Sequence, residues 1–337
     1  MRQLISFANV YQIGFLCLVH TFIFHAPATA SDPSLFFTER TSNVVRSASR
    51  DGSNLTTIVD LGATFGASYA ITGIASDGSS LFWGDFVQDS IYRSALDGSG
   101  AIEIVNLTTT FGGNFAPKGI VSAGDSLFWA DSLRGEIFTS ALDGSNVATL
   151  INLDAALGNA AYSPEGIATD GTSLFWADEF QNAIFSSSIG GTGVTELVNL
   201  FDTFGASSYA LSGIATDGNS LFWTDFSQDA IYSSAIDGSG AVQLIDLDDV
   251  FGNAVYGPTG IATDGNSLFW TDSSQDGIYT ASIDGSGAAL LINDAGNAPV
   301  YLAALAATVI PEPSILSFGI ATLFGLLVHR PRRTRLR

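Results

Sequence analysis

The 337-residue sequence contains one cysteine, Cys17, and three histidines, and all four lie near the ends of the chain. The histidines are His20, His25 and His329. The long central part therefore has neither a thiol nor an imidazole, which excludes disulfides, thiolate nucleophiles and histidine-based proton transfer there. An enzyme built on this part would depend on carboxylates, hydroxyls or the only lysine, Lys118.

Basic residues are also scarce. Between residues 31 and 310, six lysines and arginines stand against 32 aspartates and glutamates, so the net charge of this part is −26. Nucleic-acid binding requires lysine and arginine against the phosphates, and this charge excludes it. An acidic surface attracts cations. Weak Ca²⁺ binding is therefore one expectation, and no other cofactor is indicated.

Residues 1–30 have the pattern of a secretory signal peptide. Arg2 gives a basic start, an apolar stretch covers residues 4–24, and Ala28-Thr29-Ala30 supplies the small residues that a signal peptidase requires. The pattern predicts export and cleavage after Ala30. An uncleaved membrane anchor is the alternative, but Pro27 makes this segment a poor helix end.

Residues 311–337 have three parts in a fixed order. Pro311, Glu312 and Pro313 come first, an apolar run follows over residues 315–328, and an arginine-rich end closes the sequence. The run is short for a membrane span, and the arginines favour a cytoplasmic end. This order resembles the bacterial PEP-CTERM sorting signal. The resemblance implies a Gram-negative-type bacterium, transient membrane insertion through this helix, cleavage by an exosortase, and association with exopolysaccharide. A plain C-terminal anchor is the alternative.

An internal repeat determines the expected fold of residues 31–310. Tryptophans at positions 83, 129, 176, 223 and 270 are 46 or 47 residues apart, and Phe37 lies one further period upstream, which makes six copies. Each copy has four strand-like runs separated by turn residues such as Asp217-Gly218. Four strands at this period predict an all-β, six-bladed β-propeller. A solenoid is the alternative, and it would leave end repeats that need caps.

The ends of the repeat array predict how the ring closes. The first copy begins at residues 34–36 and lacks the strand that opens every later copy. Residues 300–308 align with residues 255–263, which contain that opening strand in the last copy. We expect the C-terminal segment to complete the first blade and to remove the open sheet edges.

The repeats also resemble a known family. Phe222-Trp223-Thr224-Asp225 and the later Ile-Asp-Gly-Ser turn are similar to the Tyr-Trp-Thr-Asp (YWTD) blades of low-density-lipoprotein-receptor-type propellers, over about residues 34–309. Phe replaces the family's Tyr, and no cysteine-rich module follows. The resemblance implies the six-bladed fold but not receptor function. It also implies a structural role, bonding backbone between blades, for the acidic residue after each tryptophan: Glu39, Asp85, Asp131, Asp178, Asp225 and Asp272. A ring of carboxylates that holds a cation or a basic partner is the alternative.

One aromatic residue per copy precedes the first strand. These residues are Tyr69, Phe115, Tyr162, Tyr209, Tyr256 and Tyr301. Sixfold closure would bring them to one end of the central channel, where aromatic rings beside carboxylates could bind sugar. Packing between blades uses the same residues, and both interpretations stay open.

The remaining acidic residues indicate neither a metal centre nor a catalytic site. Aspartates followed by glycine occupy turns at positions 51, 97, 143, 170, 217, 237, 264 and 284, without the alternating ligands of a calcium-binding loop. Arg93, Lys118 and Arg134 interrupt the repeat. They could mark a local contact patch, or they could be the result of sequence drift on a solvent-exposed rim.

Together these patterns predict an exported, non-enzymatic binding or scaffold protein of the cell surface. Exopolysaccharide or biofilm matrix is the expected partner. A hydrolase or lyase that acts on polysaccharide is one alternative, and a protein-adhesion module is the other.

Overall fold

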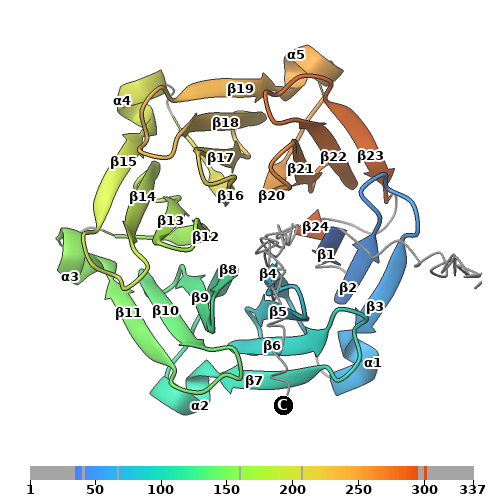
Figure 1. Ribbon diagram of the computed structural model, residues 1–337, viewed down its shortest axis with the longest axis vertical. Helices are drawn as coiled ribbons and strands as arrows, with labels where there is room; N and C mark the ends of the chain where they lie inside the picture. Colours follow the sequence, from blue (N-terminus) through green and yellow to red (C-terminus); the bar gives the residue numbers. More distant parts are fainter. Residues whose placement is uncertain are drawn as a thin grey trace, which may run out of the picture. The chain divides into compact units, whose positions relative to one another are not determined.

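The strands of the chain form six four-stranded antiparallel sheets that are arranged in a ring as the blades of a propeller (Figure 1). The computed structural model describes residues 35–39, 42–66, 68–158, 161–205, 208–252, 254–294 and 300–301. The expected all-β, six-bladed fold is confirmed. The predicted signal peptide and sorting segment, including Ala30, Pro311, Glu312 and Pro313, lie outside the described residues. Among the residues that are described, no helix is long and apolar enough to cross a membrane.

The first three blades take their strands from the first half of the chain, with one exception. Blade 1 consists of β24 (Val300–Tyr301), β1 (Leu35–Glu39), β2 (Val44–Ala48) and β3 (Thr56–Asp60). Blade 2 consists of β4 (Ile71–Ser76), β5 (Ser80–Asp85), β6 (Ser90–Ala95) and β7 (Ile102–Asn106). Blade 3 consists of β8 (Pro117–Ala123), β9 (Ser126–Asp131), β10 (Glu136–Ala141) and β11 (Ala148–Asn152).

The other three blades repeat the same order from the inside outwards. Blade 4 consists of β12 (Pro164–Thr169), β13 (Ser173–Asp178), β14 (Ala183–Ser188) and β15 (Thr195–Asn199). Blade 5 consists of β16 (Leu211–Thr216), β17 (Ser220–Asp225), β18 (Ala230–Ala235) and β19 (Val242–Asp246). Blade 6 consists of β20 (Pro258–Thr263), β21 (Ser267–Asp272), β22 (Gly277–Ser282) and β23 (Ala289–Asn293).

In each blade from blade 2 to blade 6, a tryptophan in the second strand lies in the core between that blade and the preceding one. Trp83 on β5 stacks on Tyr92, its partner on β6, with ring centroids 5.9 Å apart and planes within 9° of parallel. Trp129, Trp176, Trp223 and Trp270 stack in the same way on the third strand of their own blades. All five are fully buried, and their indole N–H groups have no hydrogen-bond partner within the described part of the chain. Phe37 takes this place in blade 1.

Five short helices follow the outer strands of blades 1 to 5. They are α1 (Leu61–Phe65), α2 (Leu107–Phe111), α3 (Leu153–Leu157), α4 (Leu200–Phe204) and α5 (Leu247–Phe251). An Asp or Asn side chain caps each of them, as Asn106 does by accepting from the backbone N–H of Thr109.

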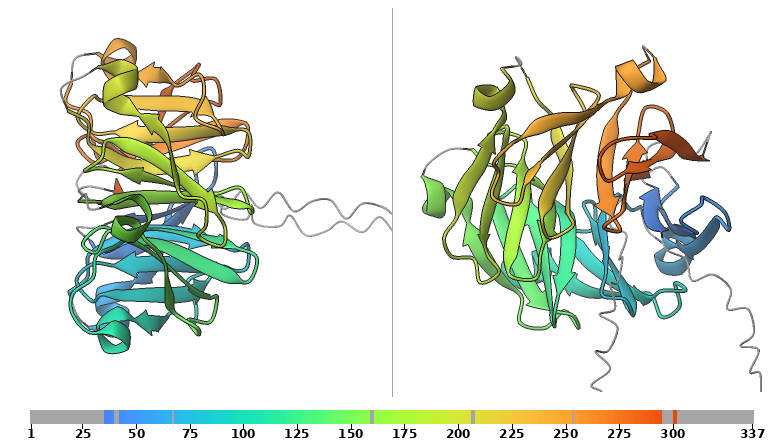
Figure 2. Two further views of the ribbon diagram at one scale, coloured as in Figure 1. Left: turned by 90° about the vertical axis from the view of Figure 1, so that its left-hand side faces the viewer. Right: turned by 45° about the horizontal axis from the view of Figure 1, so that its top comes forward.

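The short helices lie at one end of the blades. The backbone N–H of Leu107 in α2 donates to the carbonyl of Asp89 at 2.9 Å, in the loop that joins the second strand of blade 2 to its third. We call the end that carries α1–α5 and these loops the helix-side face, and Figure 2 shows the helices together on it. The Asp-Gly hairpin turns lie at the opposite end of the strands.

The strand β24 completes blade 1 from the far end of the sequence. Thr38 pairs with Tyr301 and Glu39 with Val300 in antiparallel register, so β24 is the innermost strand of the sheet. The closure that the sequence predicted is therefore present, and residues 302–308 of the predicted strand lie outside the described part.

Deletion of residues 299–309 is expected to abolish the single cooperative melt of the mature protein. Without β24, blade 1 loses its inner strand and the ring has an open edge, and calorimetry should show a broad, early transition. Deletion of residues 311–337 is the control, because every strand that the structure describes ends by Tyr301. If both truncated proteins melt like the full-length one, β24 does not close the ring.

Candidate functional site

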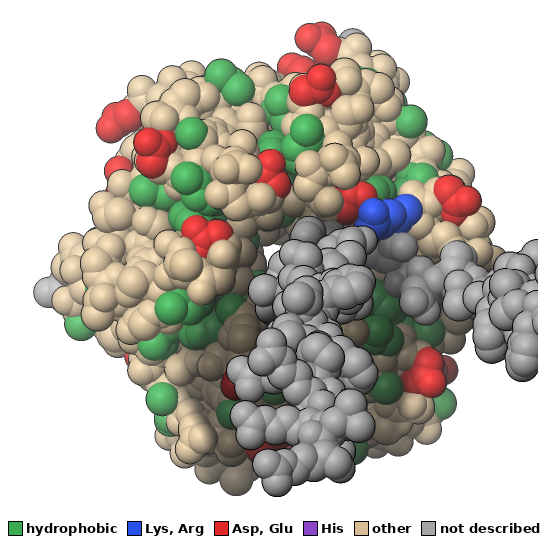
Figure 3. Space-filling view, in the orientation of Figure 1, with side chains coloured by type: hydrophobic (Ala, Val, Ile, Leu, Met, Phe, Trp, Pro, Cys, Tyr) green, Lys and Arg blue, Asp and Glu red, His purple; other side chains and the backbone are tan. Residues whose placement is uncertain are grey.

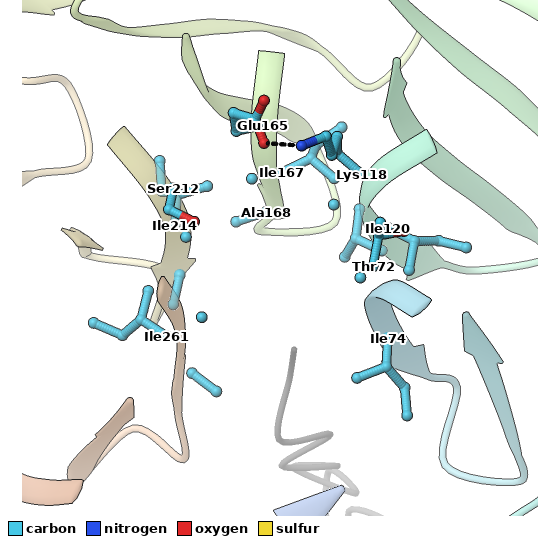
Figure 4. A pocket seen from close by; sticks show the side chains of 18 of the residues that line it. Thr72, Ile74, Lys118, Ile120, Glu165, Ile167, Ala168, Ser212, Ile214 and Ile261 are labelled. Carbon is cyan, nitrogen blue, oxygen red and sulfur yellow. Dashed lines mark ion pairs between the residues drawn. The ribbon is translucent and has the colours of Figure 1, made fainter. Parts of the chain in front are cut away.

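The inner strands of blades 2 to 6 surround a cavity of about 280 Å³ in the central channel (Figure 4). One polar or charged residue per strand forms what we call the polar ring, and its members are Thr72, Lys118, Glu165, Ser212 and Thr259. Two positions further along each strand lies a ring of isoleucines, Ile74, Ile120, Ile167, Ile214 and Ile261. The channel thus combines a polar layer with an apolar one.

A glycine between the two rings lets neighbouring inner strands approach each other. A Cβ atom placed on Gly166 would lie 2.5 Å from the carbonyl oxygen of Ser212 and 2.8 Å from the backbone nitrogen of Ile214, both in the next blade. Gly213 has the same relation to Thr259. The backbones can pack at this distance only because these positions carry no side chain.

The charged members of the polar ring form an ion pair across two blades. Lys118 Nζ, from β8, lies 3.0 Å from Glu165 Oε2, from β12 (Figure 4). Glu165 also accepts a long hydrogen bond of 3.4 Å from the hydroxyl of Ser163. Burial raises the pKa of Glu165, while Lys118 counteracts that shift. Sequence reasoning missed Glu165 and treated Lys118 as part of a contact patch. An alignment of the repeats would have revealed both. The residue before the glycine of the inner strand is Thr72, Lys118, Glu165, Ser212 and Thr259 in blades 2 to 6, so the two charged residues stand out.

The uncharged members of the ring are bonded to the protein itself. The hydroxyl of Thr72 donates to the carbonyl oxygen of Pro117 at 2.8 Å, which links blade 2 to blade 3. The hydroxyl oxygens of Thr259 and Thr271 are 2.9 Å apart within blade 6. Small hydroxyl residues at this position are therefore sufficient for the inner strands to pack.

The aspartates after the tryptophans are buried and bind backbone amides. Asp85 accepts from Ala70 at 2.8 Å and from Val87 and Gln88 at 2.9 and 2.7 Å. Asp131, Asp178, Asp225 and Asp272 make equivalent bonds. Burial raises the pKa of each despite these bonds. Their amide partners lie at the entrance to the inner strand of the same blade and in the following loop, rather than in a neighbouring blade as the resemblance implied.

Glu39 is different from the other blade acids. Its Oε1 lies 2.7 Å from Arg46 Nη1, which also lies 2.9 Å from Asp294 Oδ1, and Ser42 donates to Glu39 Oε2. Asp294 follows the last strand of blade 6, so this cluster joins blade 6 to blade 1 beside β24. Burial, with a smaller contribution from Asp294, raises the pKa of Glu39 to about 7.

The aromatic residues before the inner strands contribute to packing, one of the two interpretations that the sequence left open. Tyr69, Phe115, Tyr209 and Tyr256 are each less than 9% exposed. Tyr69 lies edge-on against Tyr92, at a centroid distance of 6.0 Å. Tyr162 is less buried and meets Phe185 in the same way. The described rings are not among the residues that line the cavity. The side chain of Tyr301 is outside the described part.

The aspartates of the Asp-Gly turns accept hydrogen bonds from residues of the same turn. Asp237 accepts from the backbone N–H of Ser239 at 2.9 Å and from its hydroxyl at 2.6 Å, and these bonds lower the pKa of Asp237. The turns at Asp51, Asp97, Asp143 and Asp284 show the same lowering by serine. Acidic side chains are spread over the visible face, and basic ones are few (Figure 3). Within the described ranges, no group of three acidic, histidine or cysteine residues is placed to hold a metal ion.

The two remaining cations of the predicted contact patch are bonded locally. Arg134 lies 4.0 Å over the ring of Phe115 and donates to the carbonyl oxygen of Gly112 at 2.9 Å. Arg93 donates to the hydroxyl of Ser80 at 3.2 Å. The structure therefore separates both from Lys118, which lies in the channel.

Exposed apolar side chains concentrate on the helix-side face. Twelve large apolar residues are exposed in the described part, and nine of them lie on its loops and helices: Phe86, Val87, Phe111, Leu133, Phe180, Phe201, Phe226, Val250 and Val255. Phe86, Leu133, Phe180 and Phe226 follow the buried aspartate in four successive blades and are 43–61% exposed. We call these four residues the apolar arc. The other three exposed residues, Ile102, Val242 and Leu290, lie on outer strands.

Solved structures of other propellers share this fold. The chain superimposes on a structure described as a nidogen/laminin complex with a TM-score of 0.63 and 19% identity, over 79% of this chain and 95% of that one. It also superimposes on a catalytically inactive histidine-to-alanine variant of virginiamycin B lyase from Staphylococcus aureus with quinupristin, with a TM-score of 0.57 and 15% identity, over 80% and 88% of the two chains.

A further structure, described as streptogramin B lyase, gives a TM-score of 0.51 and 18% identity over 70% of this chain and 71% of that one. No protein-family model and no curated protein sequence matches the chain. At these identities the similarities show a shared propeller fold, and function has to be argued from the residues of this chain.

Proposed function

We propose that the protein is an exported, non-enzymatic binding propeller that attaches to another surface protein through the apolar arc. The observation that carries the proposal is the concentration of exposed apolar side chains on the helix-side face. Scattered exposed apolar residues are ordinary, but a group on one face is typical of interaction sites. In such a site, burial of phenylalanine rings supplies much of the affinity.

The chemistry of the arc favours a protein partner. Phenylalanine and leucine offer no hydrogen-bonding groups, whereas sugar recognition needs polar groups beside the ring. The tyrosines expected to supply them pack inside the blades. Because the propeller is strongly acidic, a partner with basic residues around an apolar contact would be attracted to it. Exopolysaccharide, which the C-terminal resemblance implies, is the other outcome of the test below.

Three observations support a non-enzymatic role. Residues 31–310 contain no histidine, whereas the lyase with a similar fold is described as inactive when a histidine is replaced by alanine. The blade aspartates accept backbone hydrogen bonds and are buried, so they do not form a pair of carboxylates facing a glycan. Glu165 is neutralised by Lys118.

Export rests on the two end segments. The signal-peptide pattern and the PEP-CTERM resemblance support a route across the inner membrane, exosortase processing and a cell-surface location. Neither segment belongs to the described residues, and the binding function does not depend on which anchor is used.

The test is capture of partners from the surface fraction of the producing organism with the immobilised mature protein. Replacing Phe86, Phe180 and Phe226 by serine is expected to lower recovery of a protein partner at least tenfold. The matched control replaces Ile102, Val242 and Leu290 by serine, because these residues are equally exposed but lie on outer strands.

Equal loss of the partner in both triple variants, or no loss in either, would contradict binding through the arc. Recovery of polysaccharide without protein would move the function to matrix binding.

A further inference from the structure

We propose that the central channel binds a small zwitterion, an α-amino acid with an apolar side chain, between Lys118, Glu165 and the isoleucine ring. This site does not depend on the proposed protein partner, and Phe86 is the one member of the apolar arc that also lines the cavity. It would make the propeller a receptor for a small molecule as well as a binding protein.

The first observation is that the charged pair is not needed for the fold. The other described blades have Thr72, Ser212 and Thr259 at the same ring position, and their inner strands pack equally well. Ion pairs taken out of water contribute little net stability, because desolvation offsets their attraction. Placing the only lysine of the chain and a carboxylate side by side in the channel therefore points to a ligand.

The second observation is that both charges keep unused bonding capacity at the cavity. The Lys118 ammonium has three N–H donors and one of them reaches Glu165 at 3.0 Å. Among the residues that the structure describes, Glu165 Oε1 receives only the long bond from Ser163. A ligand carboxylate can bind to the Lys118 ammonium while a ligand ammonium binds to Glu165. The ion pair between Lys118 and Glu165 is then replaced by two ion pairs with the ligand, and the zwitterion brings no net charge into the channel.

The third observation concerns size and polarity. About 280 Å³ is at the small end of the range for ligand sites. Beyond the charges the cavity wall is apolar: Ile167, Ile214, Ala168 and Ala215 border it with the 5–7% of their surface that is left exposed, while the rest of each side chain packs between the blades (Figure 4). A molecule with an acid and an amine on one carbon and a hydrocarbon group on the same carbon matches this order of layers.

The test is titration calorimetry of the full mature protein with leucine as the probe. Leucine is expected to bind, and leucinamide and 4-methylpentanoate, which each lack one of the two charges, should bind at least tenfold more weakly. Glycine, which lacks the hydrocarbon group, should also bind at least tenfold more weakly.

Variants locate the site. Lys118→Thr/Glu165→Thr adopts the residue that blades 2 and 6 already carry, so it is expected to keep the melting temperature and to lose leucine binding. Arg50→Met removes the exposed ion pair with Asp264 and serves as the control that still binds. Absence of binding by the wild-type protein at millimolar leucine, or undiminished binding by the double variant, would overturn the proposal.

Discussion

Gly166→Ala is expected to lower the free energy of unfolding by about 3 kcal/mol, at the upper end of the cost of overpacking a tight core. The new Cβ would lie 2.5 Å from the carbonyl oxygen of Ser212, and a backbone atom cannot move aside as a flexible side chain can. The inner strands of blades 4 and 5 would have to separate, which also loosens the packing of the channel. Denaturant unfolding of the purified mature protein would measure the change.

Gly190→Ala is the matched control for this substitution. The nearest atom to a Cβ on Gly190 is the hydroxyl oxygen of Ser188 at 3.9 Å, and its backbone does not lie in the left-handed region. Its free energy of unfolding should stay within about 0.5 kcal/mol of the wild-type value. If the two variants are equally stable, the glycines do not determine the spacing of the inner strands.

Arg46→Met is expected to destabilise the protein by about 3 kcal/mol at pH 8, because it removes the ion pairs that Arg46 makes with Glu39 and Asp294, two carboxylates that lie close to each other. Both carboxylates are almost fully buried in this cluster, and they join the two ends of the ring. Arg93→Met is the control, since Arg93 forms no ion pair within the described part and bonds only a serine hydroxyl.

The loss should depend on pH in a defined direction. The pKa of Glu39 is raised to about 7, above its value in the unfolded chain. The folded state therefore binds the proton more tightly, and the unfolding free energy falls as the pH rises from about 4.5 to about 7. Without Arg46 the pKa of Glu39 should rise further, so this fall should continue to a higher pH and be larger in total, and Glu39→Gln in the same background should restore stability at pH 8. A loss that is the same at pH 5 and pH 8 would contradict this account.

The fold could be predicted from the sequence because the repeat shows the length of each blade, the positions of its turns and the strand that is missing from the first copy. The tryptophan period fixes the blade length, and the Asp-Gly pairs mark the hairpins. The missing first strand together with the alignment of residues 300–308 predicts the closure. These sequence patterns are local or periodic, and each of them predicts one structural feature.

The candidate site could be predicted only in part, because packing and binding use the same residue types. Tyr69 and its equivalents are suited to either role, and only their burial distinguishes the two. Glu165 belongs to a set of equivalent positions, one per blade, and these positions come together only when the five inner strands surround the channel. The exposure of Phe180 depends on the direction of its loop, which the sequence pattern does not encode.

The uneven distribution of tryptophan has a consequence for how unfolding can be observed. Blades 2 to 6 each contain one fully buried indole stacked on an aromatic ring, and blade 1 contains Phe37 instead. Intrinsic fluorescence therefore has one indole reporter in each of five blades and none in the sixth, which is the one that holds both ends of the array. Trp83 packs against Phe36, Val45 and Val59 of blade 1, so opening of the ring at blade 1 would change the emission of this one indole and leave that of the other four unchanged.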